Sequence, residues 1–348
     1  MKIKSEFIIN TLMKVSVCIP TYNQSQYLAL AVRSAFNQTV VPSEIVILDD
    51  CSTDNTAEVL QELAKEIPVL KIIRQPKNVG ISKNTDQCLR TATGEFIVRL
   101  DSDDILAPSY IEKLSGLLVN YPDGAYAHAA VQEIDQHGNF LRQRLLIRQS
   151  GFQKSEDALL ASKKGYRVAA NIIMFRRTAL EAVNYNTGRP NSAEDFHLSA
   201  ALAAAGFGNI YLDEILACYR VWSDAGKVRQ RRKMLEIDGV RKVFEEVLEP
   251  AYKKRGWNIS QLYKERANFA GVLSDCLGSD VYTAQEKSEL AEALNQLSSS
   301  KRAQMFAWAH MNGFGSILSS YSDFMTGLKT TFKKYRRGLR QSDIPNPI

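Results

Sequence analysis

The sequence predicts an α/β fold, with parallel strands in a sheet that helices cover on both faces. Apolar runs of strand length alternate with segments whose apolar residues recur at helical spacing, and Val15–Pro20 followed by Tyr27–Phe36 is the first such pair. Four such runs precede residue 105. This alternation is typical of right-handed strand-helix-strand crossovers. A chain of 348 residues that is 45% apolar and 24% charged has a globular composition.

The first two strands each end in a polar loop. Val15–Pro20 stops at a proline and leads into the turn Thr21–Gln24. Glu44–Leu48 leads into Asp49–Ser52, after which Thr53–Asp54 predicts the start of a helix. Each strand is therefore expected to deliver polar side chains at its carboxyl end.

The fourth strand ends in the most acidic loop of the chain. Val69–Ile73 predicts the third strand, and the turn Asn78–Gly80 starts a helix that runs to about Ala92. Phe96–Leu100 then predicts a buried strand, directly followed by Asp101–Asp104. In an open α/β sheet this is the edge at which ligands bind.

The loop Asp101–Asp104 holds three carboxylates in four residues. These charges repel one another, and a divalent cation that carries a diphosphate is a usual solution. The alternative is a solvated turn that caps a helix beginning near Pro108. The sequence contains no G-x-G-x-x-G after its first strand and no G-x-x-x-x-G-K-[ST], so dinucleotide oxidoreductases and P-loop enzymes lose their main support.

A second acidic site follows in the segment Asn191–Leu198. Ser192 is expected to be the N-cap of a helix, with Asp195 as the reciprocal capping acid three residues later, and Gly206 ends that helix. Such a capping box would by itself explain an acid at this position.

The last third of the chain is charged and helix-forming. Helices are predicted over Arg229–Glu246, Ala284–Leu297 and Phe306–Lys334. An apolar stripe from Phe314 to Phe332 runs into Lys329–Arg340, which holds six basic residues and no acidic one. This pattern suits a helix lying on an anionic membrane, with a self-packing or dimerising helix as the alternative.

Composition also bears on location. Five cysteines without regular spacing indicate reduced thiols, not a disulfide framework or a zinc site. No apolar run reaches the roughly 18 to 20 residues of a spanning helix, and Met1–Met13 has too short an apolar core for a signal peptide. We expect a cytoplasmic protein, located at the inner face of the plasma membrane if the basic C-terminal helix binds lipid. Met13 is an alternative start site.

Four blocks, in their order and spacing, resemble a family 2 glycosyltransferase with the GT-A fold. The blocks are Val15–Asn23, Ile47–Asp54, Asn78–Asn84 and Gly94–Asp104. The resemblance extends from Val15 to Tyr219 and is of the bacterial envelope polysaccharide type. It implies a Rossmann-like mixed sheet with helices on both faces, followed by a C-terminal helical region.

The resemblance also implies a division of the chain. Residues 14–226 would form the catalytic domain, with the nucleotide-sugar donor half at 14–104 and the acceptor half at 105–226. Residues 227–348 would form the C-terminal helical region, which would bind a membrane or a partner.

By the same resemblance, site residues can be assigned. Mn²⁺ or Mg²⁺ would be held by Asp103 and Asp101, because hard cations prefer carboxylate and phosphate oxygens. Asp195 would be the general base, with Glu194 beside it. The residues that would bind the donor are Thr21, Tyr22, Asp49, Asp50, Lys83, Asp101 and Ser102.

One position departs from the family. Members often carry Tyr-Arg-x-His near the end of the catalytic domain, where this chain has Tyr219–Trp222. An indole nitrogen only donates a hydrogen bond, so Trp222 cannot ligate a metal. Either the metal has no third protein ligand here or this segment is not the counterpart. Trp222 could instead pack against the diphosphate loop or an acceptor sugar.

The expected activity is inverting transfer of a hexosyl or N-acetylhexosaminyl group. The donor would be a nucleotide diphosphate sugar, with UDP favoured, and the acceptor a glycan or lipid-linked saccharide in surface polysaccharide biosynthesis. No nucleic acid partner is expected. The alternatives are a catalytically impaired nucleotide-sugar or glycan-binding subunit and a nucleotidyltransferase, although the loop after the first strand lacks the Gly-rich, basic character of the latter.

Overall fold

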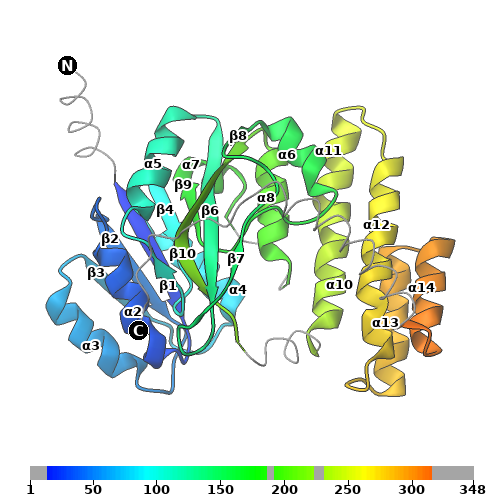
Figure 1. Ribbon diagram of the computed structural model, residues 1–348, viewed down its shortest axis with the longest axis horizontal. Helices are drawn as coiled ribbons and strands as arrows, with labels where there is room; N and C mark the ends of the chain where they lie inside the picture. Colours follow the sequence, from blue (N-terminus) through cyan, green and yellow to red (C-terminus); the bar gives the residue numbers. More distant parts are fainter. Residues whose placement is uncertain (1–13, 186–191, 223–230, 316–348) are drawn as a thin grey trace.

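The computed structural model describes residues 14–185, 192–222 and 231–315 (Figure 1). Over these residues one sheet has the strand order β3-β2-β1-β4-β9-β6-β10-β5, with β7 paired to β6 and β8 paired to β10. The strands are β1 Val15–Thr21, β2 Glu44–Asp49, β3 Leu70–Arg74, β4 Phe96–Arg99, β5 Ile105–Leu106, β6 Gly124–Ile134, β7 Phe140–Arg144, β8 Gly151–Gln153, β9 Ile173–Arg176 and β10 Gly208–Arg220.

Helices follow most of these strands. They are α2 Ser25–Phe36, α3 Thr56–Glu66, α4 Ile81–Thr91, α5 Tyr110–Asn120, α6 Ser155–Ser162, α7 Arg177–Ala182, α8 Glu194–Ala204, α10 Lys233–Lys242, the π-helix η1 Val243–Leu248, α11 Glu249–Lys254, α12 Ser260–Leu273, the 3₁₀-helix η2 Ser274–Gly278, α13 Ala284–Leu297 and α14 Lys301–Met311.

The sheet is parallel in its first half and mixed in its second. β1 lies between β2 and β4 and runs parallel to both, while β9 is antiparallel to β4 and to β6. The crossovers α2, α3 and α4 explain the parallel part, because parallel neighbours need a long connection. The predicted parallel strands and the mixed sheet implied by the resemblance are both confirmed.

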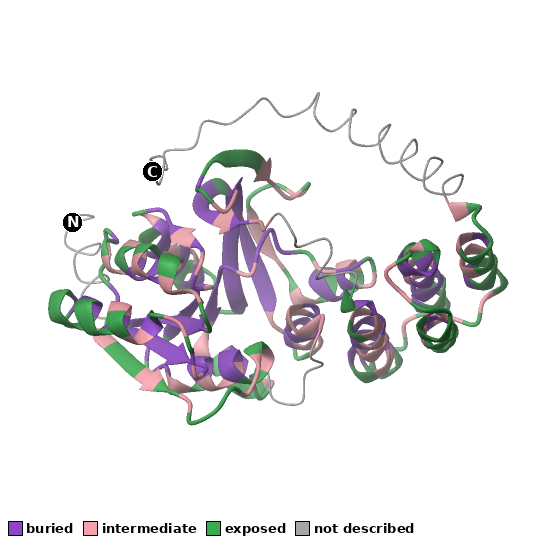
Figure 2. Ribbon diagram, turned by 90° about the horizontal axis from the view of Figure 1, so that it is seen from below, coloured by how far each residue is buried: buried purple, intermediate pink, exposed green. Residues whose placement is uncertain are grey.

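Helices cover both faces of the sheet, as predicted. Val17 and Ile19 of β1 face a core formed with α2, α3 and α5. Cys18, between them, faces the opposite core, formed with α4, α7 and α8. The alternation follows from the two-residue period of a strand, and Figure 2 shows buried central strands with partly exposed helices on either side.

The C-terminal helices α10 to α14 form a third core, coloured yellow to orange in Figure 1. Phe244, Tyr252, Leu277 and Leu294 lie within it, and it reaches α8 through Phe196. The predicted C-terminal helical region is confirmed. α13 has the predicted bounds, whereas the sequence did not predict α12.

Three expectations reach beyond the described residues. The proposed domain boundary at residues 226 and 227 lies outside them, as do Lys329–Arg340 and the start site. Of the apolar stripe, Phe314 is described and is exposed. Among the helices that the structure describes, none has the length and apolar character needed to span a bilayer.

Candidate active site

The carboxyl ends of β1, β2 and β4 meet at one edge of the sheet. Thr21 pairs in register with Asp49. The N–H of Asp50 donates to the carbonyl of Thr21 at 2.9 Å, and the N–H of Leu100 donates to the carbonyl of Cys18 at 3.0 Å. The structure therefore brings the predicted donor loops together, at the edge where α/β sheets bind ligands.

Asp49 and Asp50 are buried and organise the loops around them. Asp49 Oδ1 accepts from the N–H of Ser52 at 3.0 Å. Asp50 accepts from the N–H of Val79 at 2.8 Å and of Gly80 at 2.9 Å. Gly80 has a φ of 86°, a conformation that favours glycine. Asp50 therefore fixes the turn before α4 with both of its carboxylate oxygens.

Three other predicted donor residues differ in exposure. Thr21 is buried, and its hydroxyl has no hydrogen-bond partner within the described structure. Tyr22, the next residue, is exposed, as is Lys83 in the first turn of α4. Burying a hydroxyl without a hydrogen-bond partner costs free energy, so a ligand that forms a hydrogen bond with Thr21 would offset that penalty.

The negative charges of the acids in the Asp101–Asp104 loop repel one another. Burial and then the charge of Asp101 raise the pKa of Asp103 above its usual range. Burial and then the charges of Asp103 and Asp101 raise the pKa of Asp104 well above that range. Asp104 Oδ2 is buried and lacks a partner in the described part of the chain. Oxygen donors of this kind fit a hard divalent cation.

The acids do not form a complete metal cage. In residues 14–185, 192–222 and 231–315 no three His, Cys, Asp or Glu side chains converge as a ligand set. A cation at this loop would take its remaining ligands from water and phosphate oxygens, as Mg²⁺ commonly does.

Trp222 lies against the acidic loop. Its indole N–H donates to Asp103 Oδ2 at 2.9 Å, and its ring meets Tyr27 edge-on at 5.3 Å. Arg220 donates from its backbone to Asp104 Oδ1 at 2.8 Å and from Nε to the carbonyl of Asp103 at 2.9 Å. The segment is thus adjacent to the acidic loop, and Trp222 packs on it as a hydrogen-bond donor.

The predicted capping box at α8 is wrong. The helix begins at Glu194, its N-cap is Ala193 with a left-handed φ of 60°, and no side chain caps it. Because Ala193 takes this position, Ser192 lies outside the helix, and the carboxylate of Asp195 bonds Arg99 instead. Capping therefore does not explain the acid.

Arg99 connects the two acidic sites. It is the last residue of β4 and only 3% exposed. Its Nε donates to Asp101 Oδ1 at 3.2 Å, and its Nη1 donates to Asp195 Oδ1. Burial alone would lower the pKa of Arg99, but Asp101 and then Asp195 raise it above its ordinary value. Sequence reasoning missed this residue, although a charge inside an apolar strand indicates a buried partner.

The two acids of α8 hold protons more tightly than free carboxylates. Burial and then the charge of Asp195 raise the pKa of Glu194 to about 7. Burial raises the pKa of Asp195, and Arg99 opposes that rise. Carboxylates whose pKa is raised above the ordinary value suit general acid-base chemistry.

Comparison with known proteins identifies the family. Residues 16–183 match the sequence model described as glycosyl transferase family 2. Chondroitin synthase of Escherichia coli is 38% identical over 127 residues, which are 36% of this chain and 18% of that protein. The match spans less than a fifth of that relative's length.

Solved structures share the fold. Staphylococcus aureus TarS, determined in complex with UDP, has a TM-score of 0.54 at 16% identity, covering 86% of this chain and 92% of that one. The mannosyltransferase PcManGT of Pyrobaculum calidifontis, determined with GDP-Man and Mn²⁺, has a TM-score of 0.51 at 17% identity, covering 89% and 88%. The GT-A fold implied by the resemblance is confirmed. Residues 16–183, just under half of this chain, are a glycosyl transferase family 2 domain.

Proposed function

We propose that this chain is a metal-dependent inverting glycosyltransferase. It transfers a sugar from a nucleotide diphosphate sugar, UDP-linked, to a hydroxyl of a glycan or lipid-linked saccharide in surface polysaccharide biosynthesis. One observation carries the proposal: the buried guanidinium of Arg99 joins Asp101, on the proposed donor side, to Asp195, on the proposed acceptor side.

In this proposal each acid has a separate task. Asp50 and Thr21 hold the base and ribose, and Asp195 accepts the proton of the acceptor hydroxyl as that oxygen attacks the anomeric carbon. An in-line displacement of this kind inverts the anomeric carbon and needs no covalent intermediate. Arg99 keeps Asp195 oriented and balances the charge around it.

Asp103 and Asp101 would hold Mn²⁺ or Mg²⁺, and that cation would supply Lewis-acid stabilisation of the leaving diphosphate. The partnerless Asp104 Oδ2 and the raised pKa of Asp103 support a cation there. TarS was determined with UDP, and PcManGT with GDP-Man and Mn²⁺. Chondroitin synthase is named for a glycan. These neighbours support a nucleotide-sugar donor and a glycan product.

The proposal is tested with the full chain and a panel of UDP-sugars and GDP-sugars. Free nucleotide diphosphate is measured with and without saccharide acceptors, in Mn²⁺, in Mg²⁺ and in EDTA. We expect acceptor-stimulated release of UDP that EDTA abolishes, and a product with inverted anomeric configuration by NMR. A retained configuration contradicts the proposal. So does the formation of UTP or GTP with sugar 1-phosphate when pyrophosphate is added to the nucleotide sugar, which would indicate a nucleotidyltransferase.

The alternative is a nucleotide-sugar or glycan-binding subunit with impaired catalysis. It is favoured by the indole of Trp222, which occupies one oxygen of Asp103. In the same assay that subunit would bind a donor and release no diphosphate with any acceptor.

We also propose peripheral contact with the inner face of the plasma membrane. Met305, Trp308 and Phe314 are exposed apolar side chains in α14 and just after it, and the basic sequence Lys329–Arg340 lies further along. Anionic vesicles should sediment the full chain and fail to sediment a chain that ends at Asn312. Equal sedimentation of both chains would contradict this contact.

A further inference from the structure

The turn that carries Glu194 and Asp195 is held by a helix from the C-terminal region. α10 crosses the residues just before α8 at Gly239, which is buried. A Cβ atom at Gly239 would lie 2.1 Å from the carbonyl oxygen of Ser192 and 2.8 Å from its carbonyl carbon. Both are backbone atoms, so any larger residue must push α10 and this turn apart.

The residue next to this contact has an uncommon conformation. Ala193 has φ 60° and ψ 21°, in the left-handed region that alanine rarely occupies. Such a conformation persists only where the surrounding structure imposes it. The side chain of Ala193 also lies against Gly239, and its carbonyl accepts from the N–H of His197 at 2.8 Å. The position of Ala193 therefore sets the start of α8.

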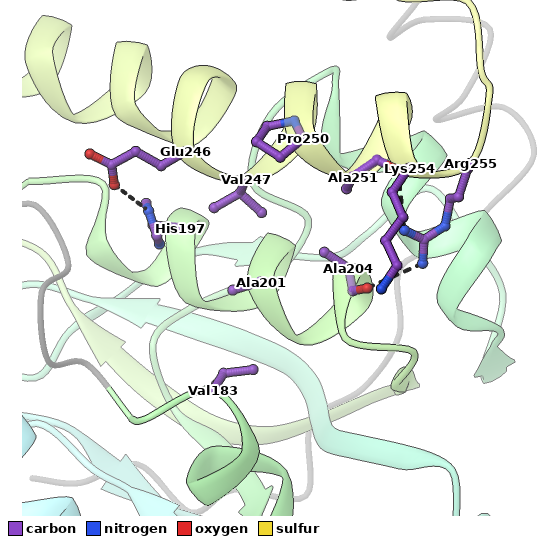
Figure 3. Close-up of a pocket in the computed structure, with 10 residues that line it drawn as sticks. All are labelled: Val183, His197, Ala201, Ala204, Glu246, Val247, Pro250, Ala251, Lys254 and Arg255. Atoms are coloured by element: carbon purple, nitrogen blue, oxygen red, sulfur yellow. Dashed lines mark hydrogen bonds and ion pairs between the residues drawn. The ribbon is translucent and has the colours of Figure 1, made fainter.

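A second contact holds the same turn of α8. His197 Nε2 lies 3.0 Å from Glu246 Oε2, and Glu246 belongs to the π-helix η1. Figure 3 shows the two side chains pointing towards each other across the gap between α8 and the C-terminal helices. Both His197 and Asp195 lie in the first turn of α8. The C-terminal helices thus contact Ser192 and Ala193 just before α8 and His197 within its first turn.

We propose that α10 is part of the active-site architecture and that Gly239 is a positioning residue for the Glu194–Asp195 pair. Gly239 lies outside residues 16–183, which match the family. Its close approach holds Ser192 and Ala193 in place, and these residues point α8 so that Asp195 meets Arg99. The assignment of Asp195 as base rests on the proposed function; the effect on the turn does not.

The test compares Gly239→Ala with Gly116→Ala. Gly116 also lies within a helix, α5, but a Cβ atom there meets nothing within 4 Å. Hydrogen exchange of the amides in residues 192–198 is measured by mass spectrometry, together with kcat and the donor KM. We expect faster exchange in this segment for G239A, and a kcat lower by about tenfold to a hundredfold, since displacement by about 1 Å can cost that much. The donor KM should change less than twofold, and G116A should match the wild type in all three.

Outcomes separate the inference from the proposed function. Unchanged exchange in G239A overturns the positioning role, as does faster exchange with an unchanged kcat in an active enzyme. A wild-type chain inert with every donor and acceptor contradicts the proposed function, while the exchange comparison still decides whether α10 fixes the turn. If G239A fails to fold, Glu246→Gln replaces it, because Glu246 is half exposed and its substitution is tolerated more easily. Loss of the Glu246 carboxylate should speed hydrogen exchange at His197 and lower kcat less than threefold. Unchanged exchange in E246Q overturns the inference.

Discussion

The proposed donor edge and the turn that carries the proposed base are built in different ways. At the donor edge, Asp50 directly follows β2, its N–H donates to the carbonyl of Thr21, and its carboxylate binds the N–H groups of one neighbouring turn. Asp195 instead takes its position from residues far along the chain: Arg99 before it and Gly239 after it. Motifs in local sequence can therefore describe the first region, and only the tertiary structure shows how the second is held.

The link between the two regions should give the largest effect. Arg99→Met leaves Asp101 and Asp195 without their shared cation, and removing one partner of a buried ion pair costs about 3–5 kcal/mol. We expect a loss of that size in the free energy of unfolding, measured by urea denaturation. Arg33→Met is the control, because Arg33 and Glu66 are about half exposed and such pairs contribute about 0–1 kcal/mol. Equal losses in the two variants would mean that Arg99 does not bind the regions together.

A substitution confined to the donor edge should weaken the binding of metal and donor and leave the structure of α8 unchanged. Asp103→Asn removes a charge from the proposed metal site, and we expect Mn²⁺ affinity, measured by calorimetry with UDP present, to fall at least about tenfold, since even outer ligands are worth about 10- to 100-fold. Asp157→Asn, at an exposed acid of α6, is the matched control. Unchanged Mn²⁺ affinity in D103N would remove Asp103 from the metal site.

The smallest effect concerns how the pH dependence of stability reflects Glu194, at the start of α8. The folded-state pKa of Glu194 is about 7, raised by burial and by Asp195 from an ordinary value of 4.5. A carboxyl with a raised pKa contributes stability that is fully present below its unfolded pKa and is lost as pH rises through its folded pKa. The wild type should therefore lose unfolding free energy between pH 4.5 and about 7, and Glu194→Gln should lose less. If the unfolding free energy of the two proteins changed with pH in the same way, the raised pKa of Glu194 would be contradicted.

The same contrast explains which parts of the structure could be predicted. Strand ends, acidic loops and the helix after Gly80 follow from patterns of a few residues, so the pattern predicts how these loops are arranged at the sheet edge. The capping box at Ser192 was wrong because Ala193, in a left-handed conformation, takes the N-cap position, and the glycine that Ser192 and Ala193 approach, Gly239, lies on a helix far along the chain. Arg99 was missed because its partners come from a loop and from a distant helix.

The measurement that tests the central claim most directly is the turnover of Asp195→Asn beside its donor affinity. Asparagine keeps the size of the side chain and a hydrogen bond acceptor for Arg99, but it cannot take a proton from the acceptor. We predict that kcat falls by about 10²- to 10⁴-fold, the usual worth of a general base, while the Kd for UDP-sugar in Mn²⁺ changes less than about threefold. A collapse of donor affinity with unchanged turnover per bound donor would contradict the account and move Asp195 to the donor site.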